Sequence, residues 1–210
     1  MNNKNEFIKK YTQIPGIQVI KKFISGSVIF VNIFNYCAFY FYNDSVSNSI
    51  PSSIITLLIA IILIFDLYSL IFYIFPKKME KVTYLYTAIA FIGSSVFCFI
   101  ISDLIFLKEL DSSISFLNMG ISLLIYVLII AAVILNIQNK TRNGYKKTHV
   151  NKALGGTISA LCISIGIILS KQADLNNIIF AVLLLVVAYS LIPTASGFHK
   201  FYLIIKNQVK

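Results

Sequence analysis

The sequence predicts an all-α fold, a polytopic membrane helical bundle of about six transmembrane helices with both termini in the cytoplasm. Of its 210 residues, 58% are hydrophobic and only 12% are charged, and the apolar residues form long blocks separated by short polar stretches. A soluble domain carries about 25% charged residues and has no interior large enough for so much apolar surface. Helices of about 20 apolar residues cross a hydrocarbon layer roughly 30 Å thick, so the blocks fit a bilayer.

Six of the blocks have the length of a membrane span. Each must be helical, because lipid offers the backbone no hydrogen-bond partner and continuous apolar runs lack the alternation of a barrel strand. The chain then divides into a cytoplasmic or interfacial segment, 1–22, a transmembrane domain, 23–192, and a cytoplasmic tail, 193–210. The expected spans are Phe23–Tyr42, Ile54–Phe75, Tyr84–Leu107, Ile114–Ile137, Ala153–Ser170 and Asn177–Ile192.

The positions of the basic residues predict the orientation. Lys108 lies in the third connection and Lys171 in the fifth. The other 16 of the 18 Lys and Arg residues lie in the N-terminal segment, the second and fourth connections and the tail. Cytoplasmic connections are enriched in basic residues, so both termini are expected inside the cell. The net charge of +10 is therefore distributed between spans, with lipid headgroups as partners, and no nucleic-acid surface is expected.

The two ends of the chain have helical character outside the spans. Apolar residues recur at helical spacing in 7–14 beside Lys9 and Lys10, which predicts a short interfacial helix that anchors the N-terminus. Pro193 and Gly197 follow the last span, so that helix is expected to kink or stop there.

Asp66 is the most informative residue, since it lies about midway along the second span. An ionised carboxylate at that depth costs roughly 2.5–3.5 kcal/mol, so it needs a proton, a partner or a wet cavity. Asn32 lies at nearly the same depth in the first span, with Asn35 one turn further on. We expect an interhelical hydrogen bond within this polar cluster. Two roles remain open: polar contacts that hold the first two helices together, or a site for an ion, a proton or a solute.

Asp103 lies about one turn from the outer end of the third span. At that depth a carboxylate can reach water or Lys108, so we interpret Asp103 as an interfacial residue without a special role.

The fifth span is rich in small residues. Gly156, Ala160 and Ser164 recur at every fourth position and form a ridge that permits close approach of another backbone. The ridge is expected to pack against neighbouring helices of this chain or against a partner protein or second copy.

No catalytic set and no metal site are expected. Cys37, Cys98 and Cys162 fall inside predicted spans, where a thiol acts as a small hydrophobe, and His149 and His199 have no partner at catalytic or metal-ligand spacing. We therefore expect a protein without enzymatic activity and without a cofactor.

The richness in Ile, Asn, Lys and Tyr and the absence of soluble domains resemble the small multi-span membrane proteins of low-GC Gram-positive bacteria. That group includes immunity proteins against bacteriocins and against type VII-secreted toxins. The resemblance implies an immunity or accessory protein of the cell membrane, with a toxin or another membrane protein as partner. The alternative is a transport component, such as a substrate-binding membrane subunit, in which Asp66, Asn32 and Asn35 bind a solute or a proton.

Overall fold

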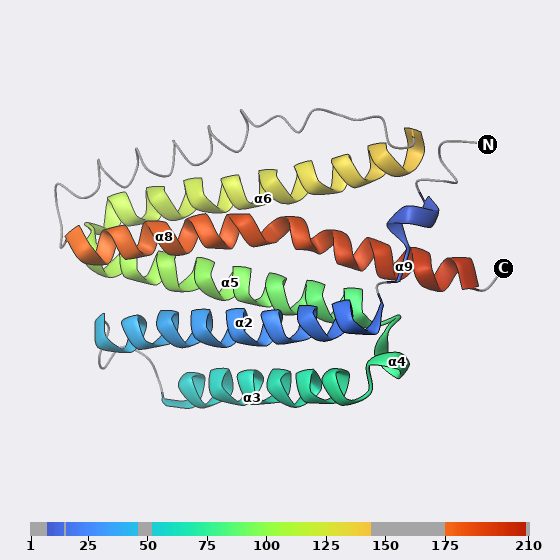
Figure 1. The fold of residues 1–210 in the computed structure, drawn as a ribbon. Coiled ribbons are helices and arrows are strands. Elements are labelled where there is room, and N and C mark those ends of the chain that lie inside the picture. Colours follow the sequence, from blue (N-terminus) through green and yellow to red (C-terminus); the bar gives the residue numbers. More distant parts are fainter. Residues whose placement is uncertain (1–7, 15, 46–51, 144–174, 209–210) are drawn as a thin grey trace.

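The long helices of the protein lie side by side with nearly parallel axes (Figure 1). The computed structural model describes residues 8–14, 16–45, 52–143 and 175–208, and within these ranges the regular structure is helical throughout. The order across the bundle is α6, α8, α5, α2, α3, so α5 is central (Figure 1). The long helices are α2 (Ile17–Ser45), α3 (Ser52–Ile74), α5 (Thr83–Glu109), α6 (Ser112–Asn143) and α8 (Leu175–Leu191). The described part of the chain thus confirms the all-helical prediction.

Within the described ranges, three segments are helical and apolar over a length that can cross a membrane: Thr83–Glu109, Ser112–Asn139 and Asn177–Lys206. A shorter apolar helix covers Ile59–Ile74. The long helices coincide with five of the six predicted spans, and α2 begins six residues before the expected Phe23. The predicted fifth span, Ala153–Ser170, lies outside the described residues.

The first and last described segments, residues 8–14 and 196–208, lie at the same end of the bundle, which we call the terminal end (Figure 1). The short helix α4 (Pro76–Met79) also lies there (Figure 1), and the 3₁₀ turn η1 (Ile192–Ala195) joins α8 to α9 (Ser196–Gln208). Pro193 in η1 lacks a backbone N–H and cannot continue an α-helix, so the predicted interruption of the last span is confirmed. Gly197 does not interrupt the helix a second time, because it lies in the first turn of α9.

The main core is formed where α5 packs antiparallel to α8. Ser95 Oγ donates a hydrogen bond to the Ala188 carbonyl at 2.6 Å, and Ser102 Oγ donates one to the Ala181 carbonyl at 2.7 Å. Both serines and both alanines are spaced by seven residues, which is two helical turns, so the pairs repeat along one seam. Small side chains let the backbones approach closely, and the serine hydroxyls are satisfied by the neighbouring helix.

A second core joins α2, α3 and α5 near the terminal end. Its buried members are Ile20, Ile24, Phe72 and Tyr86. The ring of Tyr86 stacks on that of Phe72, with centroids 4.6 Å apart, and its hydroxyl shares a 2.6 Å hydrogen bond with Ser69 Oγ. Tyr86 therefore connects α3, at one edge of the bundle, to the central helix α5.

The N-terminal segment is held against the start of α5 and α9. Residues 8–11 are helical, which is shorter than the interfacial helix expected over 7–14. Tyr11 donates a hydrogen bond to the Ser196 carbonyl at 3.3 Å, and Tyr84 donates one to the Gln13 carbonyl at 2.9 Å. The Lys200 ammonium lies 5.1 and 4.8 Å from the centroids of these two tyrosine rings. Burial, with a smaller effect of Tyr84, raises the pKa of Tyr11 to about 12, so the phenol stays a hydrogen-bond donor at physiological pH.

Candidate functional site

The predicted contact between the first two spans is present. Asn32 on α2 donates a hydrogen bond from Nδ2 to Asp66 Oδ1 on α3, with a donor–acceptor distance of 2.7 Å. Both side chains are half-buried. A short hydrogen bond from an amide to a carboxylate is stronger in an apolar surrounding than in water, because little solvent competes for either group. The expected interhelical hydrogen bond is thereby confirmed, whereas a solute or proton role for the pair stays a prediction.

Asn35 does not join this pair. It is only 8% exposed and lies at helical spacing on the same buried stripe of α2 as Ile24 and Val31. Its Oδ1 atom has no hydrogen-bond partner among the described residues. The three-residue polar cluster expected from the sequence is therefore a pair plus a separate buried amide, because positions three apart on a helix differ by about 60° in direction.

The Asn32–Asp66 contact is expected to hold α3 on the bundle. Replacing Asn32 by Ala leaves the half-buried carboxylate without its donor, and we expect the free energy of unfolding to fall by about 1–2 kcal/mol, at the upper part of the range for polar contacts between membrane helices. A double-mutant cycle measures the coupling energy between the two side chains. It compares Asn32→Ala, Asp66→Asn or Asp66→Ala, and the corresponding double variant by thermal melting of the purified proteins. Additive effects of the two substitutions would show that the contact contributes nothing.

Asp103 is buried, and the prediction that it reaches water or Lys108 is wrong. Its side chain is 4% exposed, because Asp103 lies on a face of the central helix α5 that α6 covers. Ser122 Oγ on α6 donates a hydrogen bond to Asp103 Oδ1 at 3.2 Å. The second carboxylate oxygen, Oδ2, is buried without a hydrogen-bond partner in the described part of the chain. Counting residues from the helix end gives the depth of Asp103 but not the side of the helix on which it lies.

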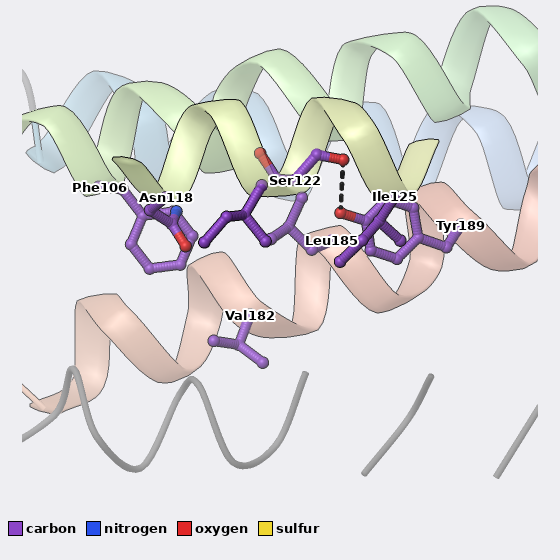
Figure 2. A pocket seen from close by; sticks show the side chains of 8 residues that line it. Phe106, Asn118, Ser122, Ile125, Val182, Leu185 and Tyr189 are labelled. Atoms are coloured by element: carbon purple, nitrogen blue, oxygen red, sulfur yellow. Dashed lines mark hydrogen bonds between the residues drawn. The ribbon is translucent and has the colours of Figure 1, made fainter. Parts of the chain in front are cut away.

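A small cavity opens beside this contact, between α5, α6 and α8 (Figure 2). Its volume is about 20 Å³, which is room for about one water molecule. Tyr189 on α8 donates its hydroxyl to the Ser122 backbone carbonyl at 3.1 Å, and Asn118 lies one turn before Ser122 on α6. Asn118 is 8% exposed, and its Nδ2 atom has no partner among the described residues. The lining residues are Phe106, Asn118, Ile121, Ser122, Ile125, Val182, Leu185 and Tyr189.

A larger cavity, of about 330 Å³, lies between α6, η1 and α9. Apolar residues line most of it, among them Val133, Ile137, Ile192 and Phe198. Gln138 and His199 are its polar members.

The predicted packing ridge of Gly156, Ala160 and Ser164 lies outside the described residues, as do Cys162 and His149. Within the described ranges, no three His, Cys, Asp or Glu side chains group as metal ligands. The serine–carbonyl seam of α5 and α8 was not predicted, although the seven-residue spacing of Ser95 with Ser102 and of Ala181 with Ala188 is a signal for it in the sequence.

The fold and these sites define a class: an all-helical protein whose described part has three helices long and apolar enough to cross a membrane, with polar contacts between its helices. Comparison with known proteins gave no match to a family model, to a curated protein or to a solved structure.

Proposed function

We propose that this chain is a multi-pass protein of the bacterial cell membrane that crosses the bilayer six times and acts through helix–helix contacts with another membrane protein. The direction of the helices supports six crossings. α6 and α8 both run toward the terminal end (Figure 1). Two spans that run in the same direction are separated by an odd number of crossings, and the sequence between Asn143 and Leu175 contains the predicted fifth span. The apolar run Ala153–Ser170 lies within this stretch.

The distribution of basic residues supports cytoplasmic termini. Among the described residues, Lys77 and Lys78 of α4, Arg142 of α6, and Lys200 and Lys206 of α9 all belong to segments at the terminal end (Figure 1). Lys108, by contrast, lies in the last turn of α5 at the opposite end, near Glu109 and Asp111. A basic end of the bundle is retained on the cytoplasmic side during insertion.

Reporter fusions test this topology. We expect a periplasmic-type reporter, active only outside the cytoplasm, to be active after Tyr42 and after Asp174, and a cytoplasmic reporter to be active after Lys140. Activity of the external reporter after Lys140, or its inactivity after Asp174, would contradict the six-span arrangement.

The use of polar side chains supports an interaction function. In the described helices, Asn32, Ser95 and Ser102 bond to groups on neighbouring helices. Only 6% of the residues in the most apolar stretch of α6 are buried, compared with 56% of those in the most apolar stretch of α5. The structure thus has a well-packed seam at its centre and a large apolar helix face beside it. Lipid, the rest of this chain or a partner helix can cover such a face.

The single observation that carries the proposal is this exposed apolar face of α6. A membrane-inserting toxin presents an apolar helical hairpin, which is the chemistry that such a face and the predicted small-residue ridge of the fifth span accept. An immunity or accessory protein would bind the hairpin within the bilayer and prevent its assembly.

Co-expression with the product of an adjacent toxin-like gene tests the proposal. We expect co-purification and protection of the cells, and we expect Gly156→Leu to weaken both while the variant still accumulates in the membrane. A matched control, Leu128→Ile on α6, keeps the apolar character and is expected to change neither. No protection and no co-purification with the unaltered chain would count against an immunity function.

A transport component remains the competing proposal, because a carboxylate and an amide meet inside the bundle at Asp66 and Asn32. It requires Asp66→Asn to abolish uptake of a candidate polar solute or its stabilisation of the purified protein. The interaction proposal instead expects Asp66→Asn to alter stability alone.

A further inference from the structure

Among the residues that the structure describes, Asp103 has no positive partner. Its side chain is 4% exposed, and its one hydrogen bond within the described ranges comes from the neutral hydroxyl of Ser122. The other ionisable groups on the helices around it are directed elsewhere: Lys108 is exposed, and Glu109 accepts a hydrogen bond from Asn177. Tyr126 bonds with Ser95, and Tyr189 donates to the Ser122 carbonyl. A carboxylate in an apolar interior needs a compensating positive charge, because the uncompensated ion is costly.

The oxygen atoms near Asp103 suit a small hard cation. Ser122 connects the carboxylate to the cavity, since its hydroxyl donates to Asp103 and its side chain lines the cavity. Asn118 lines the same cavity with an unused amide nitrogen. Rotation of the amide by 180° would present the carbonyl oxygen instead, and the two orientations are not distinguished by shape. Carboxylate, hydroxyl and amide oxygens are the ligands that hard cations prefer.

The size of the cavity and the charge of the ligands select the occupant. A volume of about 20 Å³ holds one water-sized species. It excludes a divalent ion with its retained water shell, and one carboxylate balances one positive charge. Asp103 also lies six residues before Glu109, about 9 Å along the helix axis, so the end of the bundle is close.

We propose that Asp103, Ser122 and Asn118 form a buried site for a single monovalent positive charge of water size, either Na⁺ or a proton accompanied by one water molecule. Occupation neutralises Asp103 and fastens α5 to α6 beside α8. The site is separate from the Asn32–Asp66 pair and does not depend on the proposed interaction function.

Thermal melting of the purified full chain, followed by circular dichroism, tests the proposal. At pH 8 and constant ionic strength, Na⁺ replaces choline stepwise; in a second series, the pH is lowered from 8 to 5 without Na⁺. We expect the melting temperature to rise by several degrees with saturation in one series. A rise with Na⁺ identifies the ion, and a rise only at lower pH identifies the proton.

Variants locate the response. The asparagine side chain in Asp103→Asn is neutral without a bound cation. We therefore expect this variant to melt at a higher temperature in choline and to lose the rise of the melting temperature with Na⁺ or with lower pH. Ser122→Ala is expected to shift the midpoint of the response by about tenfold. Asp66→Asn, which removes the carboxylate of the half-buried Asn32–Asp66 pair, is the control and is expected to keep the response. A wild-type melting temperature insensitive to both Na⁺ and pH, or a response that survives Asp103→Asn, would overturn the site.

Discussion

Replacing Gly197 by Ala is expected to destabilise the protein by about 2–3 kcal/mol, a large effect for one methyl group. A Cβ atom at this position would lie 2.6 Å from the Tyr84 carbonyl oxygen and 2.9 Å from Ala88 Cβ. The carbonyl belongs to the backbone of the central helix α5 and cannot turn away as a side chain would. To relieve the overlap, α9 must move, and this strains the contacts that Tyr11 and Lys200 make at the terminal end.

Melting of the purified variant by circular dichroism checks this expectation. Two other glycines serve as controls: a Cβ at Gly93 in α5 or at Gly120 in α6 meets nothing within 4 Å. Because Ala favours a helix over Gly by about 1 kcal/mol, Gly93→Ala and Gly120→Ala should leave stability unchanged or raise it. Equal losses in all three variants would show that close packing at Gly197 is not the cause.

Replacing Ser102 by Leu is expected to disrupt the seam between α5 and α8, with a loss of about 3 kcal/mol or failure to fold. Ser102 is fully buried and bonds to the carbonyl of Ala181, which is also fully buried. A leucine side chain at this point forces the two backbones apart along the main core. It also removes the hydroxyl that donates a hydrogen bond to the carbonyl of the neighbouring helix.

A conservative variant separates packing from hydrogen bonding. Ser102→Ala removes only the hydroxyl and should cost about 0.6 kcal/mol, the average for such a bond between membrane helices. Ser190→Leu on α8 is the steric control, since Ser190 is exposed and its hydroxyl donates to the Val187 carbonyl of its own helix. Thermal melting and the yield of monodisperse protein measure all three. A tolerated Ser102→Leu would mean that the seam is looser than the two serine contacts indicate.

Residue type and depth were sufficient to predict the Asn32–Asp66 contact. The two spans are consecutive and joined by a short connection, so their helices must be antiparallel neighbours and groups at equal depth meet. The interruption at Pro193 was likewise local, because a missing N–H acts on the helix in which it lies. Neither inference needed to know which helix occupies the centre of the bundle.

Asp103 shows where this reasoning ends. Asp103 was predicted to lie about one turn from the outer end of its span, and α5 ends six residues after it, at Glu109. Depth, however, does not give direction around the helix axis. On a peripheral helix, water would reach a carboxylate at this depth. α5 is covered by α8, α2 and α6, so the carboxylate of Asp103 is buried. The same limit applies to Asn35 and to the serine–carbonyl seam.

The amino-acid sequence by itself determined that the chain forms long apolar helices, where most of them begin and end, and which polar groups lie deep within them. These properties depend on local hydrogen bonding and on the transfer of side chains from water. Only the tertiary structure decided that α5 is central, that Asp103 faces Ser122 of α6, and that Gly197 touches the backbone of α5. Those facts depend on how each helix is rotated about its axis, and that rotation is set by the packing of all neighbours together.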